Sequence, residues 1–215
     1  MKRREFSQVA VGSVAAAAAG WGGASFAQGL REGADYLEVK PRAPVEAAVG
    51  KIEVVEFFWY SCPHCNAFEP LLKTWAAKAP ADVVLRRVPV AFRDDFVPQQ
   101  RLYFALEAMR LVDKLHSKVF AAIHDEKQTL ARSDAIAQWV AKQGVDMAKF
   151  TEHYNSFAVA TKASRSAQLQ NAYKVEGVPA LGVDGRFYTD GSLAGNVGRS
   201  LQVVDGLLRM VRTAK

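Results

Sequence analysis

The chain contains only two cysteines, Cys62 and Cys65, and they are separated by Pro63 and His64. Two thiols at this spacing can form and break a disulfide, which is the chemistry of thiol–disulfide exchange. A strand-like apolar run precedes the pair and a helical pattern follows it, so we expect the cysteines at the first turn of a helix. There, unpaired backbone N–H groups and the positive end of the helix dipole favour a thiolate. The residues therefore predict a redox-active disulfide.

Two other uses of the pair fit its spacing less well. A disulfide that closes so short a loop removes little entropy from the unfolded chain and would stabilise a fold only weakly. A structural zinc site needs four ligands, and only His64 lies near the cysteines in the sequence. The other histidines, His116, His124 and His153, have no ligand spacing, and we interpret them as surface or satisfied polar positions. We expect no metal and no cofactor beyond the Cys62–Cys65 disulfide.

The first 27 residues have the pattern of an export signal. A basic start containing Arg3 and Arg4 precedes a weakly apolar run, and small residues end at Ala27. We expect cleavage between Ala27 and Gln28, and a mature protein in an oxidising compartment. The arginine pair also fits a twin-arginine signal, and the general secretion route remains an alternative. The apolar run is too short and too rich in Gly and Ala to favour a retained membrane anchor.

Composition limits the class of partner and the size of the core. The formal net charge is +6, and the basic residues are spread along the chain, so we do not expect a nucleic-acid partner. The chain has 215 residues, 50% of them hydrophobic, which suffices for one domain or for a domain that carries an insertion.

The order of predicted elements indicates an α/β fold. A buried strand, a helix and a second strand form a parallel βαβ unit, and a strand pair joined by Asp184-Gly185 and a last helix follow much later. Between them we expect a helical subdomain, with Ser133 and Asp146 as candidate helix caps. The strands are expected at 35–39, 52–60, 83–90, 178–183 and 186–189, and the helices at 66–78, 98–111, 113–124, 133–144, 146–150, 156–173 and 197–212. The predicted units are 1–27 (signal peptide), 28–95, 96–172 (inserted helical subdomain) and 173–215.

One carboxylate, Glu56, interrupts the apolar strand that leads to the cysteines. A carboxylate inside such a strand is costly unless it is paired or used. An edge position that reaches water is the alternative, but the central place of Glu56 in the run favours burial.

These features resemble the thioredoxin fold (βαβ–ββα) with an inserted α-helical subdomain, and more narrowly the DsbA family of periplasmic thiol:disulfide oxidoreductases. The resemblance covers about residues 36–210. It rests on three motifs: Glu56-Phe57-Phe58, Cys62-Pro63-His64-Cys65 followed by Phe68-Glu69, and Gly177-Val178-Pro179-Ala180.

The resemblance implies an enzyme that donates its disulfide to reduced or unfolded exported proteins in the periplasm. It also implies reoxidation by a quinone-linked membrane partner of the DsbB type, and we expect a monomer. A substrate thiolate would attack Cys62, with Cys65 as the internal partner. Pro63 and His64 lie between them, and His64 would favour the reduced form by stabilising the Cys62 thiolate.

Three further residues receive roles from the resemblance. Pro179 is implied to be cis and to pack beside the disulfide, which leaves the backbone of Val178 to pair with an extended substrate. Glu56 is implied to be a buried acid that exchanges protons with Cys65, paired with a basic residue on the next strand. Arg87 is the nearest match for that residue, and Arg86 is the alternative.

Two other functions remain open from the sequence. The first is a periplasmic reductase or isomerase, although the segment from Gln28 to Gly50 has no room for the extra dimerisation domain that isomerases of this group carry. The second is a non-enzymatic chaperone that binds peptides and in which the cysteines are incidental.

Overall fold

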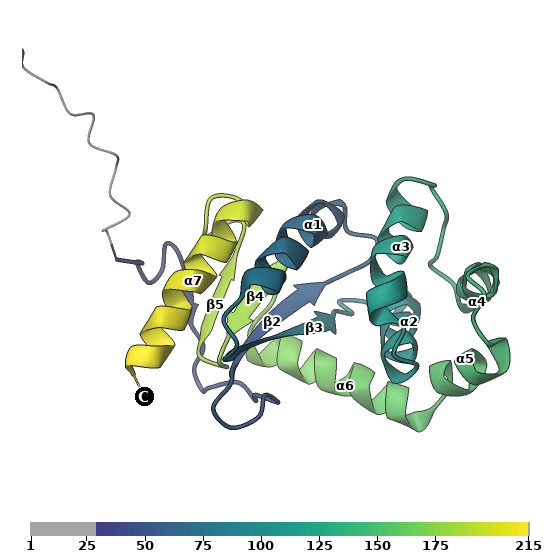
Figure 1. Cartoon of the computed structure of the whole chain (residues 1–215), viewed down its shortest axis with the longest axis horizontal. Coiled ribbons are helices and arrows are strands. Elements are labelled where there is room, and N and C mark those ends of the chain that lie inside the picture. Colours follow the sequence, from purple (N-terminus) through teal and green to yellow (C-terminus); the bar gives the residue numbers. More distant parts are fainter. Residues whose placement is uncertain (1–28, 215) are drawn as a thin grey trace, which may run out of the picture.

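The computed structural model describes residues 29–214, so the predicted signal peptide and its cleavage site lie outside the described residues. A mixed five-stranded sheet lies at the centre of this part, and a group of helices extends from one end of it (Figure 1). None of the helices in this range is long and apolar enough to cross a membrane.

The sheet has the strand order β1-β5-β4-β2-β3. The pair β2·β3 is parallel, as predicted, and β2·β4, β4·β5 and β1·β5 are antiparallel. All seven residues of β2 are buried, because β2 lies between two other strands and has helices on both faces. The bounds are Leu37–Glu38 (β1), Ile52–Phe58 (β2), Val83–Pro89 (β3), Ala180–Val183 (β4) and Phe187–Asp190 (β5).

The predicted helical segment between β3 and β4 is confirmed. We call residues 94–172 the helical block; the unit boundaries at 95/96 and 172/173 remain a proposal. Asp146 caps a helix as predicted, by accepting a hydrogen bond from the Lys149 N–H. Ser133 does not act as a cap: it is the first helical residue, and the Asp134 carboxylate lies in the first turn, where the helix dipole favours it. The helices are α1 (Pro63–Lys78), η1 (Asp94–Phe96), α2 (Val97–Ala108), α3 (Val112–His124), α4 (Ser133–Lys142), α5 (Met147–Tyr154), α6 (Phe157–Ala172) and α7 (Val197–Thr213).

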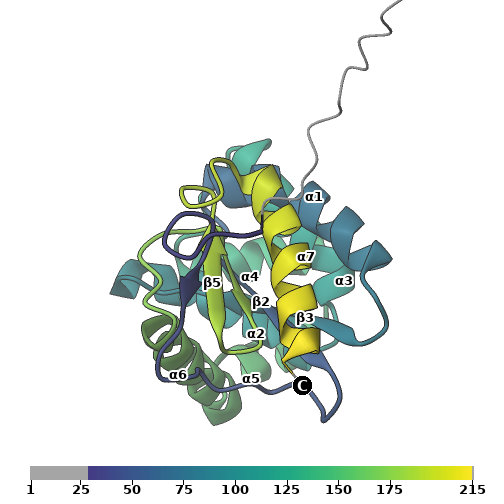
Figure 2. The ribbon, with the colours of Figure 1, turned by 90° about the vertical axis from the view of Figure 1, so that its left-hand side faces the viewer.

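Two apolar clusters hold helices against the two faces of the sheet. On one face, Leu72 of α1 shares a cluster with Val204 and Leu208 of α7. On the other face, Tyr173 at the end of α6 packs edge-on against Phe57 of β2, with 5.2 Å between the ring centroids. Figure 2 shows α7 and α1 on the first face and α6 on the second. The sheet is therefore the middle layer of three.

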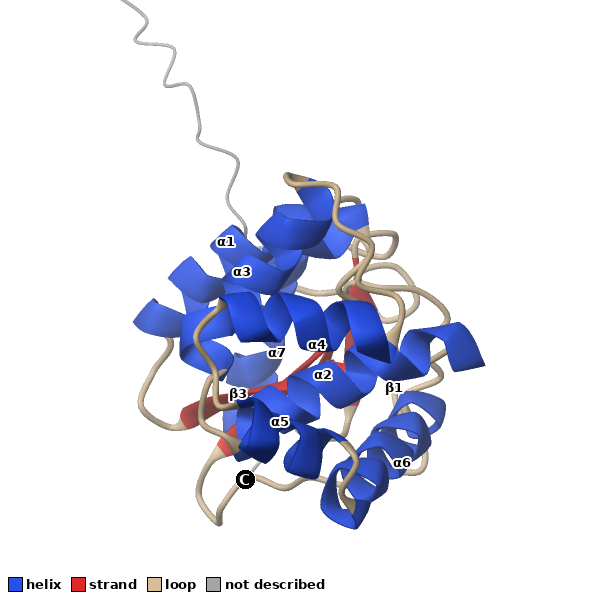
Figure 3. Cartoon of the chain, turned by 90° about the vertical axis from the view of Figure 1, so that its right-hand side faces the viewer, coloured by secondary structure: helices blue, strands red, loops and turns tan. Residues whose placement is uncertain are grey.

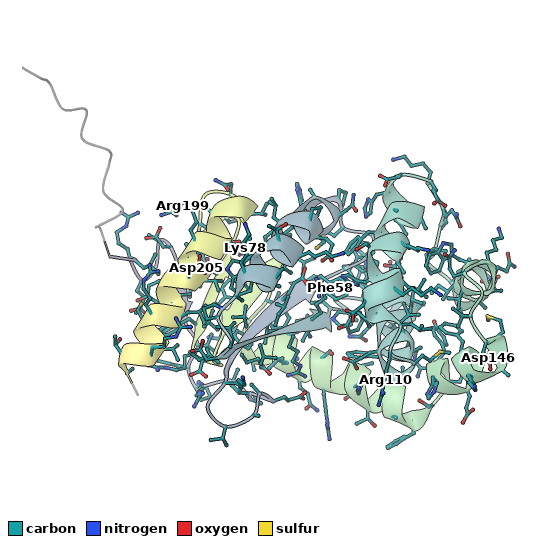
Figure 4. The ribbon with its side chains drawn as sticks, viewed as in Figure 1. Phe58, Lys78, Arg110, Asp146, Arg199 and Asp205 are labelled. Carbon is teal, nitrogen blue, oxygen red and sulfur yellow. The ribbon has the colours of Figure 1, made fainter. Side chains whose placement is uncertain are left out.

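The third cluster joins the sheet to the helical block. Phe58, the last residue of β2, packs there with side chains of α2 and α3 such as Tyr103 and Phe120. Figure 4 shows Phe58 between the sheet and these helices. Figure 3 shows α2, α3, α4 and α5 gathered at this end of the molecule. Both cysteines belong to the same cluster, so the reactive pair lies where the sheet meets the helical block.

A substitution at Gly182 tests the contact between α6 and the sheet. A Cβ at this position of β4 would overlap the ring of Tyr173. We expect Gly182→Ala to lower the free energy of unfolding by about 1–3 kcal/mol, measured by chemical denaturation of the reduced protein. The matched control is Gly177→Ala, because a Cβ there meets no atom within 4 Å. Equal stabilities for the two variants would contradict the packing described for Gly182.

Candidate active site

The two cysteines lie at the strand-to-helix junction, as predicted. Cys62 is the N-cap residue of α1, Pro63 is its first residue, and Cys65 follows within the first turn. Both are free thiols in this structure. The exposed fraction is 8% for Cys62 and 0% for Cys65, so Cys62 is the more accessible of the two, although most of its surface is covered. Pro63 and His64 are exposed.

The two thiols have opposite acidities. The Cys65 thiol donates a hydrogen bond to the Cys62 sulfur, and this bond contributes most to lowering the Cys62 pKa to about 6. The backbone N–H groups of Cys65 and His64 and the positive charge of a protonated His64 lower it further, against the opposing effect of burial. Burial is the main cause that raises the pKa of Cys65 far above its ordinary value. One thiol is therefore prepared to ionise near neutral pH and the other is not.

The loop before β4 lies against Cys62. The Val178–Pro179 peptide bond is cis, as the resemblance implies. The Cys62 thiol donates a hydrogen bond to the Val178 carbonyl, with 3.3 Å between Sγ and O. The predicted strand from Val178 was too long: β4 begins at Ala180, because Pro179 has no N–H to donate to a strand ladder. Beside this loop a groove is lined by His64, Gly177, Val178, Pro179, Gly191 and Ser192.

Glu56 is buried beneath the cysteines, as predicted, with 1% of its surface exposed. Its Oε2 atom lies 3.1 Å from Nε of Arg87, which identifies Arg87 as its partner. Arg86 instead contacts Glu46 and Glu53, at 2.8 and 3.8 Å. Burial raises the Glu56 pKa to about 8, although the charge of Arg87 opposes this shift. Glu56 can therefore change its protonation state near neutral pH.

A second carboxylate, to which the sequence assigned no role, shares the same arginine. Both carboxylate oxygens of Glu69 on α1 accept hydrogen bonds from Nη2 of Arg87, at 3.0 and 3.1 Å. Burial raises the pKa of Glu69, but its contacts with His116 and Arg87 outweigh this effect and hold the pKa below its ordinary value. The position of Glu69 four residues after Cys65, on the same side of α1, was the signal in the sequence that could have found it.

His116 is neither a surface residue nor fully satisfied, so our interpretation of it from the sequence was wrong. It is 3% exposed; its Nδ1 atom is 2.9 Å from the Tyr60 hydroxyl, and its Nε2 atom is 3.4 Å from Oε2 of Glu69. The neighbouring His124 bonds the Tyr60 carbonyl through Nε2, at 2.8 Å. Sequence spacing gave no signal, because α3 reaches the site only through tertiary packing. Among residues 29–214, no group of three or more His, Cys, Asp or Glu side chains could hold a metal ion.

An acidic thiol paired with a more deeply buried one suits stepwise disulfide exchange, and here the pair stands at the start of a helix on a thioredoxin-type sheet. The protein is thus a thiol:disulfide oxidoreductase. Its residues 86–199 match the family model described as DSBA-like thioredoxin domain. The chain belongs to the DsbA family.

Relatives over nearly the whole length support this assignment. The thiol:disulfide interchange protein DsbA of Bordetella parapertussis is 43% identical over 209 residues, which cover 97% of this chain and 98% of the relative. The Pseudomonas aeruginosa protein of the same name is 39% identical over 194 residues, which cover 90% and 92%. The crystal structure of Pseudomonas aeruginosa DsbA matches with a TM-score of 0.80 and 40% identity, over 85% of this chain and 94% of that one. DsbA from Xylella fastidiosa matches with a TM-score of 0.77 and 29% identity, over 83% and 96%.

The acidity of Cys62 can be tested directly. We expect the reduced protein to show one thiolate that forms with an apparent pKa of about 6, measured by absorbance in the far ultraviolet against the oxidised protein. Cys65→Ala should raise this pKa, because it removes the largest stabilising hydrogen bond, and Cys65→Ser should raise it less, because a hydroxyl can still donate. An unchanged Cys62 pKa in Cys65→Ala would contradict the role of the Cys65 hydrogen bond and leave the backbone N–H groups and His64 to stabilise the thiolate.

Proposed function

We propose that the protein donates its Cys62–Cys65 disulfide to reduced or unfolded proteins exported to the periplasm. The low pKa of Cys62 carries this proposal. A stabilised thiolate favours the dithiol form, and so makes the disulfide a stronger oxidant. The names of the relatives, thiol:disulfide interchange protein, agree with this chemistry.

The reaction transfers two electrons from the substrate to the enzyme in two steps. A substrate thiolate attacks Sγ of Cys62, a mixed disulfide forms, and the Cys62–Cys65 bond breaks with its electron pair on Cys65. A second substrate thiolate then attacks the substrate sulfur of the mixed disulfide, and Cys62 leaves as a thiolate. The substrate gains a disulfide, and the enzyme is left with the reduced pair.

Glu56 would supply the proton that Cys65 needs in the first step. The buried Cys65 sulfur is very unfavourable as an anion, and ionisation of Glu56 would make it more so. With a pKa of about 8, Glu56 holds a proton at neutral pH and can release it when Cys65 becomes the leaving group. Reoxidation would return this proton to Glu56.

The loop at Val178 and Pro179 would bind the substrate backbone. The Val178 N–H makes no hydrogen bond within residues 29–214, so it is free to pair with an extended peptide, while its carbonyl faces Cys62. Backbone pairing does not depend on the identity of the substrate side chains, which suits an enzyme with many substrates. The exposed Pro63 and His64 border the same approach to Cys62.

The cycle requires a partner that takes electrons from the reduced enzyme. We infer a quinone-linked membrane oxidase of the DsbB type, with the protein acting as a monomer after removal of residues 1–27. The relatives' names support the family chemistry, and the basic, weakly apolar start of the chain supports export.

The reduction potential tests the direction of electron flow. We expect equilibration with glutathione to give a potential at or above about −180 mV, within the range of known oxidants and isomerases. A potential near that of thioredoxin, about −270 mV, would contradict the role as an oxidant and favour a reductase.

Cys62→Ser should abolish oxidative refolding of a reduced substrate. Cys65→Ser, which keeps Cys62, should capture a disulfide-containing substrate as a mixed disulfide. Full refolding activity in Cys62→Ser would instead favour a peptide-binding chaperone.

The role of Glu56 has its own test. Glu56→Gln should slow the release of Cys65 and remove the ionisation near pH 8 from the pH profile of disulfide exchange. Stopped-flow measurement of the first exchange step, from mildly acidic to mildly basic pH, follows both effects. Glu46→Gln is the matched control, because Glu46 pairs with Arg86 and not with Arg87. The proton-transfer role fails if both variants keep the profile of the unmodified protein.

A further inference from the structure

His116 reaches the charged groups beneath the cysteines from the helical block. It lies on α3, far along the chain from the active-site motif, and it is packed among the rings of Phe58, Tyr60, Tyr103 and Phe120. The exchange steps proposed for the thiols do not use it. A buried imidazole among aromatic rings is costly unless its polar atoms are hydrogen-bonded.

The two ring nitrogens of His116 have distinct neighbours. Nδ1 is bonded to the Tyr60 hydroxyl. Nε2 makes no contact that meets hydrogen-bond geometry among residues 29–214, and it faces Oε2 of Glu69 at 3.4 Å. Burial is the main cause that lowers the His116 pKa, so the ring is neutral and carries one proton. A lone pair on Nε2 facing a carboxylate would be repelled, so the proton belongs on Nε2, and Nδ1 accepts from Tyr60. Tyr60 thus selects the tautomer that presents an N–H to Glu69.

Glu69 and Glu56 compete for one positive charge. Nη2 of Arg87 bonds Glu69, and Nε of Arg87 lies against Glu56. Two buried carboxylates that share one arginine do not both ionise easily, so an additional donor on either one decides which takes the proton. His116 is placed to supply that donor to Glu69, with Nε2 at 3.4 Å from Oε2, and no matching donor to Glu56 other than Arg87 occurs among residues 29–214.

We propose that His116 is a positioning residue: it holds Glu69 on Arg87 as a carboxylate, so that the exchangeable proton of the buried pair resides on Glu56. This inference rests on the proposed role of Glu56 as the proton donor to Cys65. The titratable and charged groups that face His116 come from the β2–α1 segment, α1, β3 and α2; they are Tyr60, Glu69, Lys73, Arg87 and Tyr103.

The experiment measures the carboxyl groups directly, without disulfide exchange. Reduced protein with isotopically labelled Glu side chains is titrated by NMR, and Glu56→Gln and Glu69→Gln assign the two resonances. We expect His116→Leu to raise the Glu69 pKa by about one unit or more, since a donor is lost from a buried carboxylate, and to lower the Glu56 pKa. Tyr60→Phe should shift both carboxyl pKa values in the same directions but by less. It removes the hydroxyl that selects the His116 tautomer, and it leaves the imidazole in place. It also provides the test if His116→Leu does not fold.

A double variant shows whether His116 acts through Glu69. In a Glu69→Gln background, His116→Leu should cause no further change in the Glu56 pKa. His153→Leu, on α5, controls for the loss of a histidine and should move neither carboxyl group. An unchanged Glu69 pKa in both His116→Leu and Tyr60→Phe overturns the proposal, as does an equal Glu56 shift with and without Glu69. Failure of the Glu56 proton-transfer role would instead show in the kinetics of Glu56→Gln, with these carboxyl titrations unaffected.

Discussion

The hydrogen bonds that stabilise a negative charge on Cys62 are the interaction on which the rest of the site depends. The Cys65 thiol and the N–H groups of the first turn of α1 all point at one sulfur. They can do so because Cys62 is the N-cap residue and Pro63, which has no N–H, takes the first helical position. The same geometry that makes Cys62 a good leaving group places Cys65 in the core, where it cannot remain an anion. Acidity of one thiol therefore creates the need for a proton at the other.

That need explains why a carboxylate occupies the central strand. Glu56 in a wholly buried β2 is unfavourable for stability, and its single arginine is shared with Glu69. A fully neutralised pair would give Glu56 an ordinary acidic pKa and leave it without a proton at neutral pH. Incomplete neutralisation keeps the pKa near the working pH. The unfavourable burial and the proposed function thus have the same physical origin.

The sequence predicted the parts of this arrangement that depend on local pattern. The apolar run before Cys62 and the helical pattern after Cys65 were sufficient to place the pair at a strand-to-helix junction. The preference for Arg87 over Arg86 came from the family resemblance, and the parallel register Glu56↔Arg87 of β2 and β3 agrees with it. The apolar pattern wrongly predicted Val178 as part of the strand. The strand begins at Ala180, and the Val178 carbonyl accepts a hydrogen bond from Cys62 instead.

His116 illustrates what a single sequence does not contain. Its contact with Glu69 depends on how α3 packs against α1, and neither helix specifies that packing by its own periodicity. Its ring orientation depends further on the Tyr60 hydroxyl, which is held in the same aromatic cluster. The helical block therefore does more than cover the end of the sheet: through α3 it contacts both the segment before Cys62 and a carboxylate below it. Tyr60, Glu69 and Arg87 connect α3 to Glu56 through direct contacts. A change in the packing of the helical block would therefore alter the protonation of Glu56 and, through it, the proton supply to Cys65.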